Sequence, residues 1–203
     1  MEITTPFHMI LSSATMCGKT CWTLKFLRQM DRLLDKMPAN IYYFYNQYNE
    51  AFGAEDLSHV QFIHGLPDEI SKDSLIILDD YMQNKEAQAF LTEMSVQGVH
   101  HKNSSVIQLR QNLFHGGRTS RINAQYICLL RNPTDKLQIQ TLGRQIFPRS
   151  KGFLLESYED ATKKPYGYLF LNLHPACTDE KLRVVSGIFQ DENMYVYLPK
   201  KRL

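Results

Sequence analysis

The chain has 203 residues, 43% of them hydrophobic and 22% charged; this is the composition of an ordinary globular protein, with length for one α/β domain, 1–203, but not for two. No apolar run approaches the roughly 20 residues that span a bilayer, and the N-terminus lacks the basic start and apolar core of a secretory signal. The net charge of +2 neither requires nor excludes nucleic acid, because a basic face can be hidden in a balanced total.

Short apolar runs alternate with stretches of helical periodicity along the chain. A buried strand at 7–11 comes first, and then Trp22, Leu27 and Met30 recur at helical spacing in a helix that reaches about Lys36. Further strands are predicted at 41–45, 60–63, 75–78, 105–109, 126–130, 167–171, 184–189 and 194–198, and further helices at 87–96, 136–146 and 153–161. This alternation indicates a mainly parallel, three-layer α/β fold, with the C-terminal strands extending or flanking its sheet.

The segment between the first strand and the first helix matches a phosphate-binding loop: Ser13, Ala14, Thr15, Met16, Cys17, Gly18, Lys19 and Thr20. Such a loop needs a strand, a glycine-containing turn and a helix, so that backbone N–H groups and the helix dipole converge on phosphates. We expect Lys19 to contact the β- and γ-phosphates of ATP and Thr20 to bind Mg²⁺, with Cys21 beside the nucleotide. Ser13 stands where the usual pattern has its first glycine, and a positive φ there would cost about 1 kcal/mol.

Two carboxylates follow the aliphatic strand at 75–78, about 60 residues after Lys19, which is the form of a Walker B motif. We expect Asp79 to hold Mg²⁺, and Asp80 to orient and polarise the attacking water as general base or as positioner. In isolation such a pair is commonly a turn after a core strand, but its coincidence with the loop favours a catalytic site.

Polar residues also end the strand at 105–109. In an open parallel sheet the carboxyl strand ends face the ligand crevice, so Gln111 or Asn112 could contact the γ-phosphate or hold the water. A ring-forming ATPase also needs one arginine delivered across a subunit interface. The candidates are Arg118, Arg121, Arg131 and Arg144. Their positions in the sequence do not show which of them has this role.

With these motifs the chain resembles the packaging ATPases of Polinton (Maverick) elements and adintoviruses, which are similar to poxvirus-type genome-packaging ATPases within the FtsK/HerA superfamily. The resemblance runs through nearly the whole chain. Its segments are 17–20, 78–80, 100–107, 111–114, 121–123, 131–135, 142–148, 165–173 and 196–200. The string His-His…Gln-Asn-Leu-Phe…Asn-Pro…Asp is far more specific than the phosphate loop.

The resemblance implies a P-loop NTPase fold of the RecA and FtsK/HerA type. It also implies a motor that moves double-stranded DNA into a preformed capsid, at a portal vertex, as a ring of about six subunits. By the family pattern Gln111 occupies the sensor position, and Arg121 or Arg144 is the arginine that acts in a neighbouring subunit. The four cysteines show no C-x-x-C spacing, which favours a reduced, intracellular compartment; for such a motor this is the host nucleus or the site of virus assembly.

Two other functions compete with this one. A nucleotide kinase would need an arginine-rich lid and an acceptor pocket, and no segment of the sequence resembles such a lid. A nucleotide-binding scaffold with little turnover would follow if Ser13 impaired the loop. Hydrolysis of ATP that duplex DNA accelerates would separate the motor from both.

Overall fold

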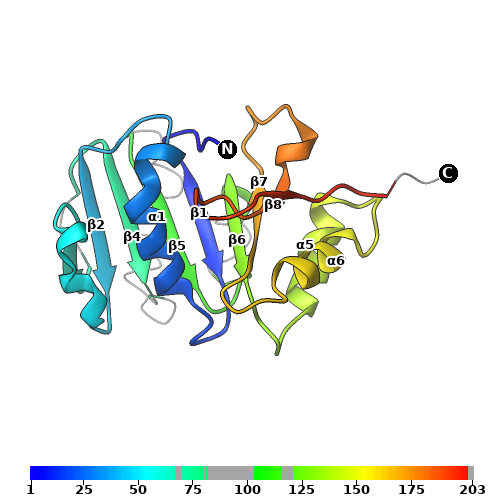
Figure 1. Cartoon of the computed structure of the whole chain (residues 1–203), viewed down its shortest axis with the longest axis horizontal. Helices are drawn as coiled ribbons and strands as arrows, with labels where there is room; N and C mark the ends of the chain where they lie inside the picture. Colours follow the sequence, from blue (N-terminus) through cyan, green and yellow to red (C-terminus); the bar gives the residue numbers. More distant parts are fainter. Residues whose placement is uncertain (67–69, 80, 82–102, 116–120, 201–203) are drawn as a thin grey trace.

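The structure is a computed structural model, and the residues that it describes are 1–66, 70–79, 81, 103–115 and 121–200. The strands are β1 (His8–Ser12), β2 (Asn40–Tyr45), β3 (Gln61–His64), β4 (Ser74–Asp79), β5 (Ser105–Arg110), β6 (Tyr126–Leu130), β7 (Tyr168–Asn172), β8 (Val184–Ser186) and β9 (Tyr195–Val196). Within the described ranges they form one sheet in the order β3-β2-β4-β5-β1-β6-β7-β8-β9 (Figure 1).

The sheet is parallel from β3 to β6 and antiparallel from β6 to β9. β4, β5 and β6 are buried almost throughout, as continuous aliphatic runs predict for strands covered on both faces. The three C-terminal strands extend the sheet beyond β6, as expected. β7 has the predicted length, whereas β8 and β9 are shorter than predicted, with three and two residues.

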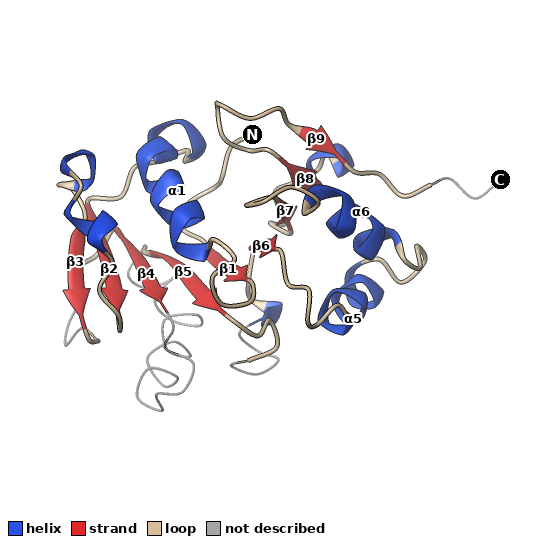
Figure 2. Cartoon of the chain, turned by 60° about the horizontal axis from the view of Figure 1, so that its bottom comes forward, coloured by secondary structure: helices blue, strands red, loops and turns tan. Residues whose placement is uncertain are grey.

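Helices cover both faces of the sheet (Figure 2). The α-helices are α1 (Lys19–Leu33), α5 (Leu137–Ile146) and α6 (Phe153–Ala161), and short 3₁₀ helices are η1 (Glu50–Gly53), η2 (Glu55–Leu57) and η4 (Glu180–Leu182). α1 packs on the face that carries Met9 and Leu11, whereas α5 and α6 pack on the face that carries Ile10 and Ile127. Since side chains alternate along a strand, these two clusters lie on opposite faces, and the three-layer α/β fold is confirmed.

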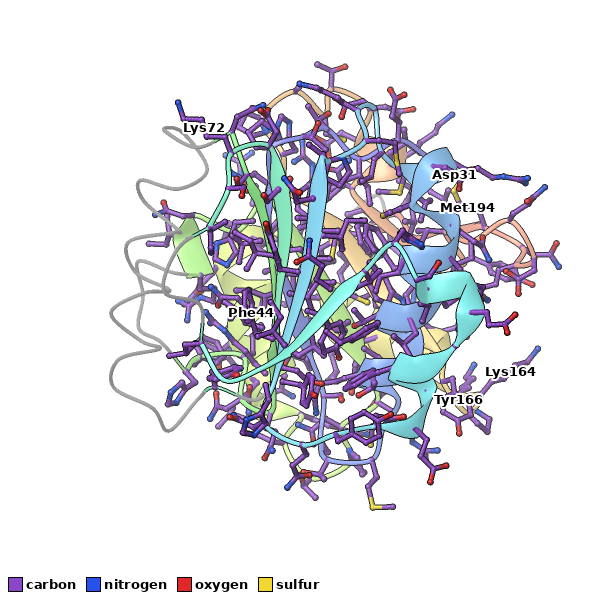
Figure 3. The ribbon with its side chains drawn as sticks, turned by 90° about the vertical axis from the view of Figure 1, so that its left-hand side faces the viewer. Asp31, Phe44, Lys72, Lys164, Tyr166 and Met194 are labelled. Carbon is purple, nitrogen blue, oxygen red and sulfur yellow. The ribbon has the colours of Figure 1, made fainter. Side chains whose placement is uncertain are left out.

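Seen along the sheet, α1 and the segment with η1 and η2 lie on one side, where Asp31 marks α1, and Phe44 lies on the other (Figure 3). Phe44 belongs to a third apolar cluster with Ile76 and Leu78. The helix expected at 87–96 lies outside the described residues. No helix in the described part of the chain is long and apolar enough to cross a membrane.

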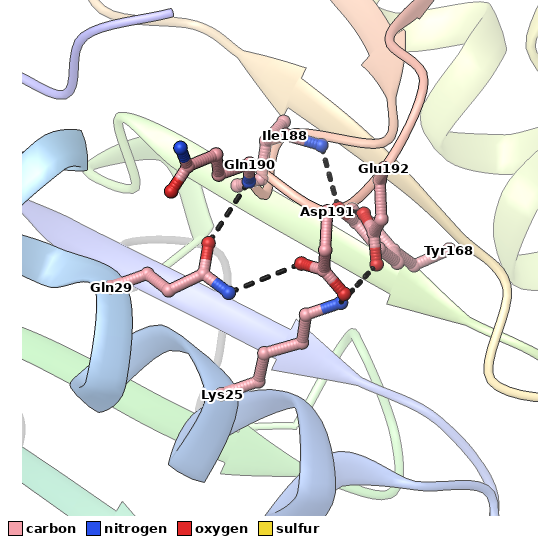
Figure 4. Close-up of polar contacts among 7 residues, drawn as sticks. All are labelled: Lys25, Gln29, Tyr168, Ile188, Gln190, Asp191 and Glu192. Atoms are coloured by element: carbon pink, nitrogen blue, oxygen red, sulfur yellow. Dashed lines mark hydrogen bonds and ion pairs between the residues drawn. The ribbon is translucent and has the colours of Figure 1, made fainter.

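Hydrogen bonds and ion pairs connect the segment 188–192 to α1 and to the start of β7 (Figure 4). The Lys25 ammonium of α1 lies 2.8 Å from Asp191 Oδ2 and 2.7 Å from Glu192 Oε1. The Tyr168 hydroxyl at the start of β7 donates to Glu192 Oε2 at 2.5 Å. These bonds fix the first half of α1, and hence the turn before it, against β7.

Candidate phosphate-binding site

The turn between β1 and α1 holds residues 13–18, and α1 begins at Lys19. Its backbone is left-handed at Met16 (φ 60°) and at Gly18 (φ 95°). A Cβ on Gly18 would lie 2.7 Å from Cδ1 of Tyr166, so a side chain there would have to displace that ring. The Trp22 N–H donates to the Gly18 carbonyl at 2.9 Å and starts the helical ladder; the N–H groups before it lie outside that ladder, where an anion can bind them.

Ser13 does not carry the strain that its place in the motif suggests. Its φ is not positive, and the left-handed residues of this turn are Met16 and Gly18. Ser13 is 1% exposed, its N–H donates to the Arg110 carbonyl at 3.1 Å, and its hydroxyl donates to the Ala14 carbonyl at 2.9 Å. Serine therefore continues the line of β1 beside β5, and the expected cost of replacing glycine does not arise.

The Lys19 side chain folds back across the turn. Its ammonium lies 3.4 Å from the Ser13 carbonyl oxygen and 3.3 Å from that of Ala14. These are long bonds to neutral acceptors, which a phosphate oxygen would replace with a stronger, charge-assisted bond. The cation is thus held over the turn where the motif needs it.

The other loop residues differ in exposure. Thr15 and Met16 are exposed at the tip, where Met16 is 97% exposed, whereas Ala14 and Cys17 are half-buried. Cys21 is exposed on the first turn of α1. All of them lie in the turn or in the first turn of α1, so a ligand in the loop would lie near them.

The carboxyl end of β5 lies between the phosphate loop and the acidic strand end. Ser12 of β1 pairs with Arg110, and Asp79 of β4 pairs with Leu109. Gln111 is the residue directly after Arg110, the last residue of β5. The sheet therefore brings the loop, Gln111 and Asp79 to one edge, as the sequence predicted. β4 is not adjacent to β1, however, because β5 is inserted between them. Asp80 lies outside the described residues.

A tyrosine connects the two halves of the site. The Tyr43 hydroxyl, from β2, donates to Asp79 Oδ2 at 2.8 Å, and the Thr20 side chain is hydrogen-bonded to the same hydroxyl. Tyr43 is fully buried, and burial, followed by the charge of Asp79, raises its pKa well above the ordinary value, whereas the bond with Thr20 acts in the opposite direction. Thr20 and Asp79, the two residues expected to hold Mg²⁺, are therefore linked through one hydroxyl.

Sequence reasoning missed this role for Tyr43. Its strand reads as an aromatic core segment, and its ring does pack against Phe52 and Phe62. Nothing in the local pattern separates its hydroxyl from that of Tyr42, which bonds Ser71 instead. Only the pairing of β2 with β4 identifies it.

The two candidates at the end of β5 have different surroundings. Asn112 is engaged in its own turn, where its Oδ1 accepts from the Phe114 N–H at 2.8 Å and its carbonyl accepts from the His115 N–H at 3.2 Å. Gln111 precedes this turn and is half-buried at the edge shared with Asp79. The geometry therefore favours Gln111 over Asn112 as the residue near a γ-phosphate.

The arginines occupy different places. The Arg121 guanidinium lies 4.2 Å from the centre of the Phe114 ring, close enough to Arg110 that its charge, after burial, helps lower the Arg110 pKa to about 10. Arg144 is exposed in the last turn of α5, and Arg131 is exposed directly after β6. Arg118 lies outside the described residues.

Together, a mainly parallel sheet covered on both faces and a strand–turn–helix at its carboxyl edge give the chain the three-layer α/β fold of the P-loop NTPases. The site combines the N–H groups at the start of α1, a lysine, a hydroxyl and a carboxylate at one edge, a combination suited to a phosphate with a divalent cation.

No protein-family model matches the chain, and no curated protein matches its sequence. Solved structures do match. They include the genome packaging NTPase B204 from Sulfolobus turreted icosahedral virus 2 in complex with AMPPCP, with a TM-score of 0.55 and 13% identity over 96% of this chain and 98% of that one. The DNA-packaging ATPase B204 from Sulfolobus turreted icosahedral virus has a TM-score of 0.54 and 11% identity over 98% of this chain and 100% of that one. At such identities the likeness establishes a shared fold.

Proposed function

We propose that the chain is an ATP-hydrolysing motor that translocates double-stranded DNA into a preformed viral capsid, of the Polinton and adintovirus type. The observation that carries this proposal is the strand order, in which β5 brings Gln111 between the phosphate loop and Asp79. The likeness in fold to viral DNA-packaging ATPases supports it. The proposed partners are duplex DNA, the capsid vertex and further copies of this chain in a ring, at the site of virus assembly.

In the proposed reaction the loop N–H groups and Lys19 hold the β- and γ-phosphates of ATP. Thr20 and Asp79 supply the hydroxyl and carboxylate oxygens that Mg²⁺ prefers, and the bound cation would neutralise charge on the phosphates. Asp80 orients and polarises the attacking water, and Gln111 contacts the γ-phosphate. Arg121 or Arg144 completes the site of a neighbouring subunit; exposure favours Arg144, since Arg121 packs on Phe114.

The relaxed backbone at Ser13 argues against a scaffold with impaired turnover, because the loop keeps its shape without the first glycine.

The test is hydrolysis of ATP by the full chain, with and without Mg²⁺ and with and without linear duplex DNA. We expect hydrolysis that requires Mg²⁺ and that accelerates with DNA, because a motor couples turnover to its track. Heparin, a polyanion without base pairs, is the control for charge alone. A rate that DNA leaves unchanged, or that heparin raises equally, would contradict a DNA motor, and absence of hydrolysis would indicate a scaffold.

Tyr43→Phe should raise the Mg²⁺ concentration for half-maximal ATP hydrolysis by roughly tenfold, with a smaller change at saturating Mg²⁺. The substitution removes only the hydroxyl that orients Asp79 and contacts Thr20. Tyr126→Phe is the matched control, because it removes a buried hydroxyl that accepts from the Thr4 N–H, away from the loop. If both variants shift the Mg²⁺ dependence equally, Tyr43 does not position the metal ligands.

A further inference from the structure

An exposed aromatic ring lies against the phosphate loop. Tyr166, in the turn between α6 and β7, is 68% exposed, yet a Cβ on Gly18 would lie 2.7 Å from its Cδ1 and 3.3 Å from its Cε1. Leu130 Cδ2, at the end of β6, lies 3.6 Å from the same point. One edge of the ring therefore packs on the loop, while most of its surface faces solvent.

The turn that carries this ring is closely packed. Tyr166 is left-handed, with φ 60°, and such a backbone in a bulky residue is maintained by its surroundings. The Gly167 N–H donates to the Lys164 carbonyl at 3.1 Å, and a Cβ on Gly167 would lie 2.4 Å from the Ala161 carbonyl oxygen. The end of α6 thus presses directly on the turn and fixes where Tyr166 points.

The end of β6 is hydrogen-bonded to α6, the helix that precedes the turn with Tyr166. The Tyr158 hydroxyl of α6 donates to the Leu130 carbonyl at 3.0 Å and accepts from the Asn132 N–H at 2.6 Å. The turn after α6 is therefore positioned beside the end of β6, which is the strand adjacent to β1. In Figure 3, Lys164 and Tyr166 lie on the α1 side of the sheet, at the opposite end from Asp31.

The sheet order assigns the two sides of the loop to the two ends of a nucleotide. β5 and β4, with Gln111 and Asp79, lie on one side of β1, and β6 and β7 lie on the other. This step rests on the proposed function, in which the γ-phosphate lies toward Asp79 and Gln111. The nucleoside must then leave the loop on the β6 side, where Tyr166 stands.

We propose that Tyr166 is the stacking platform for the base of the bound nucleotide. A base has a flat π-face, and an exposed tyrosine ring held beside the phosphates offers a matching one. Stacking adds affinity for any base, so Tyr166 strengthens nucleotide binding without selecting adenine over guanine.

The test compares two probes by calorimetry on the full chain in Mg²⁺: AMPPCP, which has a base, and inorganic tripolyphosphate, which has none. Tyr166→Ala should weaken AMPPCP binding about tenfold and leave tripolyphosphate binding unchanged, whereas Tyr166→Phe should bind both as the wild type does. Alanine keeps a Cβ at the left-handed position, so the backbone preference of the turn is not relieved. Tyr195→Ala is the control, since Tyr195 is 60% exposed on β9.

Each outcome decides. Equal weakening of both probes means that Tyr166 only shapes the loop, and no weakening of either means that the base lies elsewhere; both results overturn the inference and leave the proposed function standing. A wild-type chain that binds neither probe overturns the proposed function and the inference with it.

Discussion

Replacing Lys19 with alanine should weaken ATP binding by on the order of 100-fold, and hydrolysis should fall below detection at ordinary ATP concentrations. The Lys19 ammonium already lies over the turn, 3.3 Å from the Ala14 carbonyl oxygen. With ATP bound it would instead make charge-assisted bonds to two phosphates, each contributing about 1.5–3 kcal/mol, and each 1.4 kcal/mol is tenfold in affinity. Calorimetry with AMPPCP measures the loss directly.

Lys36→Ala is the matched control. It removes the same charge from an exposed lysine just after α1, where the ammonium lies 3.8 Å from Asp73 at the opposite edge of the sheet. We expect this variant to bind AMPPCP as the wild type does. If Lys36→Ala weakened binding as much as Lys19→Ala, the effect would be one of net charge and the loop would not be the site.

Asp80→Asn separates binding from turnover. Asparagine cannot accept a proton from water, so this variant should bind ATP with nearly unchanged affinity and lose hydrolysis. Equal loss of binding in Asp80→Asn and Lys19→Ala would refute the division of roles between the two residues. The comparison needs only calorimetry and a phosphate-release assay on the same samples.

The elements of this fold follow from the sequence because each is coded locally. Leu75–Ile76–Ile77–Leu78 becomes the core of β4, and the helix predicted at 153–161 matches α6. A continuous aliphatic run and a 3.6-residue period are properties of neighbouring residues, so they survive without knowledge of the rest of the chain.

The order of the strands does not follow in the same way. The insertion of β5 between β1 and β4 depends on pairings such as Ser12 with Arg110, which join residues almost a hundred positions apart. Hydrophobic patterning shows that a strand is buried, but buried strands of similar composition can exchange places. The expectation that Gln111 and Asp79 share one edge was correct because all parallel strands end there, whatever their order.

The residues that the sequence did not single out make contacts between segments that are far apart in the chain. Tyr43 reaches Asp79 from β2, and Tyr166 reaches Gly18 from the turn before β7. Each reads as an ordinary aromatic in its own segment. Ser13 shows the opposite case: a motif comparison marked it as a departure, and the backbone shows that the position needs no glycine.

Lowering the pH from 6.5 toward 3 should destabilise the folded protein by several kcal/mol through His8 alone. His8 is fully buried in β1, and burial, followed by the charge of Arg110, lowers its pKa from 6.5 to about 3, although the neighbouring Gln108 side chain acts in the opposite direction. Below pH 6.5 His8 therefore becomes protonated in the unfolded chain, whereas in the folded chain it becomes protonated only near pH 3. Between these values stability falls with pH by about 1.4 kcal/mol per unit.

His8→Gln removes the titrating ring and keeps a polar side chain of similar length beside Gln108 and Arg110. Urea unfolding at several pH values should show the wild-type free energy of unfolding falling, relative to the variant, by about 1.4 kcal/mol per pH unit below 6. The slope is the readout, because any constant cost of the substitution cancels in it. His59→Gln is the control, because it makes the same substitution at an exposed position, and it should keep the wild-type slope. Parallel pH profiles for wild type and His8→Gln would mean that His8 becomes protonated without unfolding the sheet, and the buried ring would then have a route to water that its packing in β1 does not suggest.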